Sequence, residues 1–407
     1  MQTKLSLLAA CAALVAFLVP FADAQKPPPA KTSQRADGIA VPEKQQKLEG
    51  VQKTVSGHVV VAGSKIYYEE CGSGPSAVVL LHDEWLHSVT WDEIWKPLCV
   101  KYHVVRFDRR GYGRSEAAKA EFSPTEDVLT LLNDRKIQRA VVVGSSSGAA
   151  LSVDFALAHP ELVEGLFLIG PAVDGIATSA EFQTRVDRNS APLKDGDAMA
   201  AAENWSKDRY ILGEGHGPAR TKFYDELVGN PQNLKNGTEF ATPFSPAAGG
   251  RLTEIHIPTE IVVGEFDISD VHAVAGAIEE GIAGSQRDVV INAGHLVQLE
   301  QPDIVLEKLT NFVDRQERKA VEVPVEVLKT YAGTYNAGNR GLTVAFEDGR
   351  LSAQAPGQAS APLFAESQTK FFFRTSDVQV EFVKNAAGKV TRALIYQDGE
   401  TIKAARM

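Results

Sequence analysis

The sequence has few cysteines and no excess of positive charge, and both shortages narrow the possible functions. Three cysteines in 407 residues are too few for a disulfide framework, and no Cys/His cluster has the spacing of metal ligands. The chain carries 42 basic and 52 acidic residues, a net charge of −10, and it lacks a dense basic cluster. This balance argues against nucleic acid as a partner. A glycine-rich phosphate loop followed by lysine is also missing, so we expect neither a metal nor an organic cofactor.

Long hydrophobic runs are confined to the N-terminus. Residues 1–24 combine an early Lys4, an apolar stretch and a small-residue ending at 22–24 (Ala-Asp-Ala), which is typical of a cleaved signal peptide. We therefore expect an exported protein, periplasmic or secreted. Lipidation at Cys11 is the alternative, although it would leave an apolar segment on the mature chain. No later stretch is long enough to cross a bilayer, so we expect no stable membrane insertion.

Cleavage of the signal peptide would leave a mature chain with a polar N-terminal segment and two cysteines. Residues 25–50 are rich in Pro, Lys and Gln and poor in aromatics, which predicts a flexible leader. Cys71 and Cys99 then remain as the only cysteines. They can pair in an oxidising compartment, or they can serve as two small buried hydrophobic residues, and the sequence leaves both possibilities open.

Residues 51–318 alternate buried-strand patterns with helical patterns. A hairpin is expected around 62–64, and a helix follows Ser123 and Pro124, which stand at its N-cap and first position. Strands alternating with helices predict a mostly parallel sheet of the α/β class. We predict that five short apolar runs form its strands: 76–82, 102–108, 140–144, 162–171 and 257–267.

Two segments depart from this alternation. Residues of about 172–252 are rich in Ala, Asp and Asn, with one expected helix around 197–211, and we interpret them as a lid over one edge of the sheet. Residues 319–407 alternate apolar and polar positions with period two. Turn signals at 348–349, 387–388 and 398–399 divide them, so we predict a small separate antiparallel β domain.

The stretch VVVGSSSGAA contains the candidate nucleophile. A buried strand precedes it and a helix follows it, which is the setting of a nucleophile elbow with the pattern G-x-S-x-G. The pattern assigns Gly144 and Gly148 as the elbow glycines and Ser146 as the nucleophile. The N–H of Ser147 would begin the helix and point at a developing oxyanion, whereas Ser145 is only a neighbour.

A serine hydroxyl needs a base that is oriented by a third group. In this architecture the chain order is serine, acid, histidine. Asp267 follows a predicted strand directly, and His295 follows the apolar run VVIN. We therefore predict Asp267 as the acid and His295 as the base, in preference to the neighbouring acids Glu265 and Asp270.

Over about residues 56–315 the chain resembles the α/β-hydrolase superfamily, in its esterase, lipase, haloperoxidase and aminopeptidase branch. The resemblance implies an α/β-hydrolase fold and the triad Ser146, Asp267 and His295. It also implies an oxyanion hole made by the backbone N–H groups of Ser147 and Glu84. The blocks that carry it are LLHDEWLHSVTWDEIW, RFDRRGYGRS, VVVGSSSGAALSVDFALAHPELV, GEFD and AGH.

The first of these blocks departs from the family pattern. Asp83 stands where the family usually has a glycine after the histidine, and that glycine often requires φ > 0. Aspartate tolerates a left-handed conformation better than most residues, so the turn can survive. The carboxylate of Glu84 would oppose an oxyanion unless its side chain points away or is paired.

The C-terminal region resembles, over a shorter span, the small β domain appended to beta-lactamase-like serine peptidases. YAGTY, LTVAFEDGRL and ALIYQDG carry this resemblance. Its expected role is packing, or oligomerisation of identical chains. Residues 371–373, three phenylalanines, would then be core, or alternatively a contact with substrate.

Together these features predict a serine hydrolase of the carboxylesterase kind, acting on a small-molecule ester or related acyl substrate through an acyl-enzyme. Aminopeptidase activity with Glu203, Glu226 or Glu239 holding the substrate amine is an alternative, as is cofactor-free perhydrolysis by the same triad. A non-catalytic binding protein that keeps the fold is the alternative from a different class.

Overall fold

A computed structural model describes residues 53–235, 240–338, 340–358, 360–397 and 399–407. The expected signal peptide, the leader and Cys11 lie outside this part. An eight-stranded sheet has the order β1-β2-β4-β3-β5-β6-β7-β8, parallel from β4 to β8 and antiparallel at the β1 and β2 edge. Its strands are β1 (Val55–Val61), β2 (Ser64–Cys71), β3 (Ala77–Leu81), β4 (His103–Phe107), β5 (Ala140–Ser145), β6 (Val163–Ile169), β7 (Thr259–Gly264) and β8 (Gln286–Val290).

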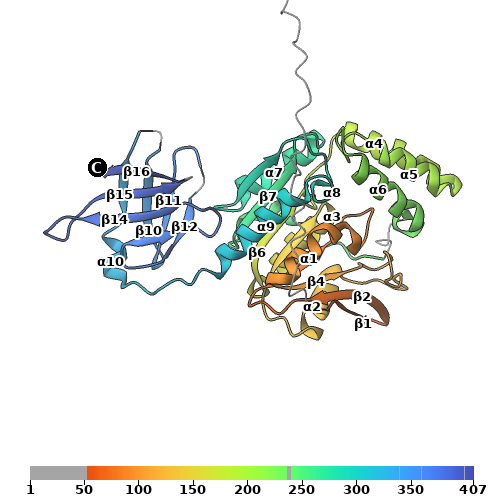
Figure 1. The fold of residues 1–407 in the computed structure, drawn as a ribbon, viewed down its shortest axis with the longest axis horizontal. Helices are drawn as coiled ribbons and strands as arrows, with labels where there is room; N and C mark the ends of the chain where they lie inside the picture. The colour runs from red at the N-terminus through yellow and green to blue at the C-terminus, as the bar shows by residue number, and fades with distance from the viewer. Residues whose placement is uncertain (1–52, 236–239, 339, 359, 398) are drawn as a thin grey trace, which may run out of the picture. The chain divides into compact units, whose positions relative to one another are not determined.

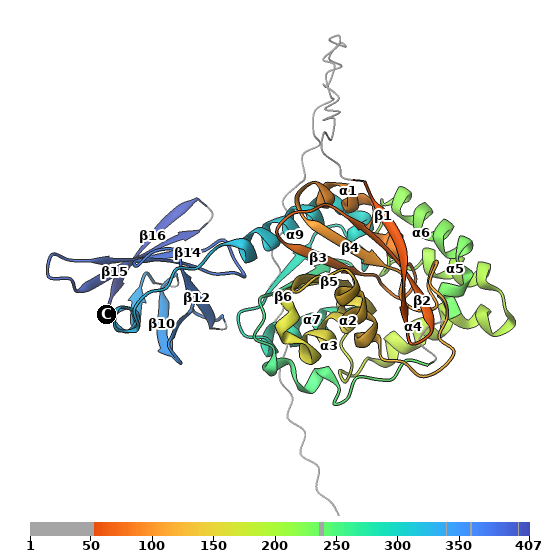
Figure 2. The same cartoon turned by 90° about the horizontal axis from the view of Figure 1, so that it is seen from below.

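Helices cover both faces of the sheet, which explains why the central strand β3 is apolar at every position. Val78 and Leu80 of β3 face one cluster, and Val79 and Leu81 face the other. Figure 2 shows α1 and α9 above the strands and α2, α3 and α7 below them. These helices and the short α8 are α1 (Asp92–Lys101), α2 (Pro124–Asp134), α3 (Ser147–Ala158), α7 (Ser269–Gly281), α8 (Val297–Glu300) and α9 (Pro302–Glu317).

Between β6 and β7 the described residues (170–235 and 240–258) form three α-helices where a single helix was expected. They lie side by side in Figure 1 and are α4 (Ala180–Ser190), α5 (Ala198–Ser206) and α6 (Gly217–Gly229). The expected helix over 197–211 is wrong in its end: α5 stops at Ser206. Asp208 then accepts a hydrogen bond from Tyr210 N at 2.9 Å, which turns the chain into a non-helical segment.

The C-terminal residues form a closed antiparallel barrel, which confirms the predicted β domain. The short helix α10 (Val325–Lys329) precedes it. Tyr331 and Phe382 stack at 4.3 Å in its core, where Phe371 is also buried, so Phe371 is a core residue. The strands are β9 (Gly333–Asn336), β10 (Leu342–Glu347), β11 (Arg350–Gln354), β12 (Ala361–Ala365), β13 (Lys370–Phe372), β14 (Gln379–Lys384), β15 (Val390–Gln397) and β16 (Glu400–Arg406).

Two observations bear on the cysteines and on membranes. Cys71 at the end of β2 and Cys99 in α1 form a disulfide, with their Cα atoms 5.4 Å apart. The pairing that the sequence left open is therefore present.

In the part of the chain that the structure describes, no helix is both long and apolar enough to span a bilayer.

Candidate active site

Ser146 occupies a sharp turn between β5 and α3. Its backbone has φ 54° and ψ −118°, a conformation that costs a non-glycine residue about 1–3 kcal/mol. The turn is held because Ser146 N donates to Ile169 O at 2.9 Å. Neither flanking glycine has room for a side chain: a Cβ at Gly144 would lie 2.4 Å from Gly148 O, and one at Gly148 would lie 2.3 Å from Leu81 O.

The structure places Ser146, His295 and Asp267 in one hydrogen-bonded chain. His295 Nε2 lies 2.8 Å from Ser146 Oγ, and His295 Nδ1 lies 2.8 Å from Asp267 Oδ2. All three residues are buried, and the other carboxylate oxygen of Asp267 accepts from Ile268 N. A proton on Nδ1 donates to the carboxylate, which leaves Nε2 free to accept the serine proton.

Sheet topology explains why three residues so far apart in sequence meet. The chain leaves β5, β7 and β8 at the same edge of the sheet, because these strands are parallel. Ser146, Asp267 and His295 follow those three strands in that order. The two rival acids serve elsewhere: Glu265 accepts from Asn292 N, and Asp270 accepts from Ser179.

The loop after β3 contains His82, Asp83 and Glu84. The turn survives at Asp83, as the sequence allowed, but without the positive φ that the family's glycine often requires. The Asp83 carboxylate stabilises the turn by accepting hydrogen bonds from the N–H groups of Trp85 (2.9 Å) and Leu86 (2.8 Å). Glu84 is half-buried at this turn.

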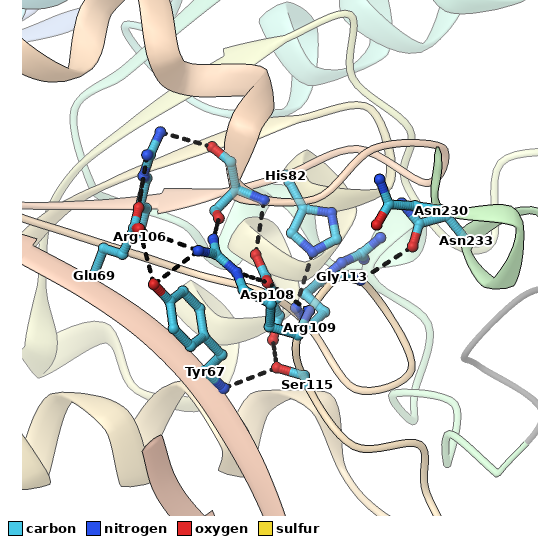
Figure 3. Close-up of polar contacts among 12 residues, drawn as sticks. Tyr67, Glu69, His82, Arg106, Asp108, Arg109, Gly113, Ser115, Asn230 and Asn233 are labelled. Atoms are coloured by element: carbon cyan, nitrogen blue, oxygen red, sulfur yellow. Dashed lines mark hydrogen bonds and ion pairs between the residues drawn. The ribbon is translucent and has the colours of Figure 1, made fainter. Parts of the chain in front are cut away.

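His82 is a buried neutral imidazole, and its hydrogen bonds determine which ring nitrogen carries the proton. Burial, reinforced by the charge of Arg109, holds its pKa well below the usual range. Nε2 accepts from Arg109 N at 2.9 Å (Figure 3). The proton must therefore be on Nδ1, which lies 2.6 Å from Asp83 O. His82 therefore supports the loop and holds a proton permanently.

The other two serines of the stretch have separate environments. Ser147 is the first residue of α3, so its N–H has no acceptor within the helix. The hydroxyl of Ser145 is fully buried and accepts from Gln298 Nε2 at 3.1 Å. Gln298 lies in α8, directly after the histidine loop, so Ser145 links that helix to the elbow.

A segment of the predicted lid is bonded to the histidine loop. His295 N donates to Tyr210 O at 2.8 Å. The carboxylate of Glu300 accepts from Gly213 N of the lid and from Gly294 N of the loop, both at 2.6 Å. Burial raises the pKa of Glu300, while these two N–H donors act in the opposite direction. Glu300 could not be predicted, because no local motif marks a carboxylate that accepts a hydrogen bond from a residue 87 positions away.

Aromatic rings connect the same lid to the imidazole. Trp85 meets His295 edge-on with ring centroids 5.7 Å apart, and it packs on Trp205 at 4.9 Å and Phe223 at 6.4 Å. Trp205 and Phe223 belong to α5 and α6. Any acyl group that reached Ser146 from this side would meet an apolar wall.

One cavity among the described residues is not lined by the triad. It measures about 640 Å³ and is lined by α4 and residues 207–210, with Arg185, Arg188 and Arg209 among the lining side chains. Ser146 itself is only 8% exposed. Among the described residues, no group of three or more His, Cys, Asp or Glu side chains is placed to hold a metal ion.

Comparison with known proteins identifies both parts of the chain. The Alpha/beta hydrolase family matches residues 78–308, and a domain of unknown function (DUF3471) matches residues 317–406. A 2-hydroxy-6-oxononadienedioate/2-hydroxy-6-oxononatrienedioate hydrolase of Escherichia coli K12 is 25% identical over 263 residues, 62% of this chain and 91% of that protein.

Solved structures show the same fold. A thermophilic esterase from Thermogutta terrifontis has a TM-score of 0.56 at 22% identity, covering 65% of this chain and 99% of that chain. The enol-lactonase from Burkholderia xenovorans LB400 has a TM-score of 0.55 at 21% identity, covering 63% of this chain and all of that chain.

Proposed function

Because this chain belongs to the alpha/beta hydrolase family, we propose that it is an exported serine hydrolase that cleaves an ester or related acyl bond of a small molecule. The observation that carries the proposal is the unbroken chain from Ser146 Oγ through His295 to Asp267, with both links at 2.8 Å. A family member without catalytic activity would have no need of a strained, buried serine aligned with a base.

The proposed reaction proceeds through an acyl-enzyme. Ser146 Oγ attacks the carbonyl carbon while His295 Nε2 takes the serine proton, and Asp267 stabilises the resulting imidazolium. The N–H groups of Ser147 and Glu84 would donate to the oxyanion. His295 then returns the proton to the leaving alcohol, and water repeats the sequence to release the acid.

Ester cleavage is favoured over aminopeptidase activity. Structural relatives include esterases and an enol-lactonase, which supports an oxygen ester as the substrate class. Of the acids considered for holding an amine, Glu203 forms an ion pair with Lys207, and Glu226 accepts from Asn230. Glu239 lies outside the described residues.

Export is supported by two independent features. The first 24 residues have the pattern of a signal peptide, and the disulfide between Cys71 and Cys99 is of the kind that persists in an oxidising compartment. Assembly of identical chains through the barrel remains a prediction.

A fluorophosphonate probe on the mature protein tests the nucleophile. We expect labelling of the wild type and of Ser145→Ala, and none of Ser146→Ala. A folded wild type that does not react would refute the proposal and favour a binding protein. Initial rates on p-nitrophenyl esters and amino-acid p-nitroanilides then separate esterase from peptidase.

A further inference from the structure

One guanidinium nitrogen bridges the two segments that supply the proposed oxyanion hole: it bonds to Asp83, the residue before Glu84, and to Ser147. Arg109 Nη2 lies 2.9 Å from Asp83 O and 2.9 Å from Ser147 Oγ. A guanidinium NH₂ group carries two hydrogens in a fixed plane, so this nitrogen can donate to both acceptors at once. The residues come from different elements: Asp83 follows β3, Arg109 follows β4 and Ser147 opens α3.

The bond to Asp83 O determines where the N–H of Glu84 points. The Asp83 carbonyl and the Glu84 N–H belong to a single trans peptide group, whose C=O and N–H point in opposite directions. Two donors hold that carbonyl, Nδ1–H of His82 at 2.6 Å and Nη2–H of Arg109 at 2.9 Å. Donors on the carbonyl also polarise the peptide and strengthen its N–H as a donor.

The backbone of Arg109 is anchored in the same loop. Its N–H donates to His82 Nε2 at 2.9 Å, as Figure 3 shows. The guanidinium also lies over the ring of Tyr112, 5.0 Å from the ring centroid. The Tyr112 ring and the Asp83 carbonyl therefore hold the guanidinium, and the His82 imidazole holds the backbone, before any substrate arrives.

The positive charge of Arg109 also offsets the carboxylates of Asp83 and Glu84, which would otherwise oppose an oxyanion at this loop. Burial raises the pKa of Tyr112 to about 12; the charge of Arg109 acts against this, and Glu84 and Asp83 add to it. The phenol thus lies within the electrostatic reach of all three groups. A fixed cation here offsets two carboxylates beside the place where negative charge would develop.

We propose that Arg109 is a positioning residue that joins the two halves of the oxyanion hole and orients the Glu84 N–H. This inference rests on the proposed serine-hydrolase function. It concerns the transition state, because Arg109 holds the Asp83 carbonyl and the Ser147 hydroxyl, which belong to the segments whose N–H groups would bind the oxyanion, and it does not itself bind the ground-state substrate.

The test compares Arg109→Gln with a matched arginine removal, Arg114→Gln, in the same loop. For each variant we would measure kcat and KM on a p-nitrophenyl ester, and the Ki of a trifluoromethyl ketone, which forms a tetrahedral oxyanion. Removing an oxyanion donor outright costs roughly 10²–10³ in kcat, so displacing one should cost about 10–10². We expect Arg109→Gln to lower kcat and ketone affinity together by that factor with KM nearly unchanged, and Arg114→Gln to keep wild-type values.

Two further variants keep the test decisive. Ser147→Ala removes one acceptor but leaves the carbonyl bond, so its loss should be smaller than that of Arg109→Gln. Arg109→Lys keeps the charge and should retain part of the wild-type ketone affinity. It takes the place of Arg109→Gln in the test if that variant does not fold. Wild-type ketone affinity in a folded Arg109 variant would overturn the inference, whereas failure of the fluorophosphonate to label wild-type Ser146 would overturn the proposed function itself.

Discussion

Asp154 provides a test of the energetics of the elbow helix. It lies in α3, the helix that begins directly after Ser146, and its side chain is buried with one carboxylate oxygen unpartnered. Burial, together with the nearby charge of Asp174, raises the pKa of Asp154 from 3.8 to about 7. Replacing it by asparagine removes a charge that the folded protein solvates poorly.

The sign and size of the effect follow from linkage. Below its ordinary pKa, Asp154 is protonated in the folded and unfolded states, so it costs nothing. Between 3.8 and about 7 the unfolded chain releases a proton that the folded protein keeps, and stability falls as pH rises. At 1.36 kcal/mol per pH unit the full loss is about 4 kcal/mol, complete above the folded pKa.

Urea unfolding of the wild type and Asp154→Asn at two pH values measures this loss. Between about pH 5.5 and about pH 8.5 the wild type should lose roughly 2 kcal/mol that the variant keeps. Asp174→Asn, which leaves Asp154 in place, should reduce the loss only in part because burial is the larger cause. Wild-type and Asp154→Asn stabilities that change in parallel with pH would refute the reasoning.

Three further predictions concern the disulfide, the elbow and the histidine loop. Replacing Cys71 and Cys99 by serine should cost roughly 3–4 kcal/mol by the loop-entropy model for a separation of 28 residues, measured by urea unfolding with and without reductant. Gly148→Ala should destabilise the fold by about 3 kcal/mol or more, because its Cβ would clash with backbone atoms. Gly276→Ala in α7 is the control and should not destabilise it, because there is room for a Cβ at that position. The midpoints of urea unfolding compare the two variants. Glu300→Gln should cost roughly 2–3 kcal/mol and lower kcat more than KM changes, because an amide accepts from only one of the two N–H groups.

Local sequence was sufficient for most of the sheet and for the residues of the candidate triad. Apolar runs such as AVVVG form strands because both faces are buried, and their ends lie within two or three residues of the predicted ones. The choice of Ser146 over its neighbours needed only the strand–turn–helix setting. Chain order then selected Asp267 and His295, the pair that the structure brings to Ser146.

Other features were decided by contacts between distant segments. The lid helices α4 and α6 escaped prediction because much of their surface is polar and exposed, and the end of α5 depends on bonds around Asp208. Asp83 avoids the left-handed turn because its own carboxylate accepts two N–H groups of the loop. Closure of the barrel depends on β9 pairing with β16, strands at opposite ends of the region.

The sequence by itself determined the identities of the candidate triad residues and the order in which they follow the strands. Only the tertiary structure placed Arg109 between Asp83 and Ser147, and Glu300 between the lid and the histidine loop. The physical reason is range. Strand and turn patterns arise from neighbouring residues, whereas a charged side chain bridging backbone groups from different elements leaves no periodic trace in the chain.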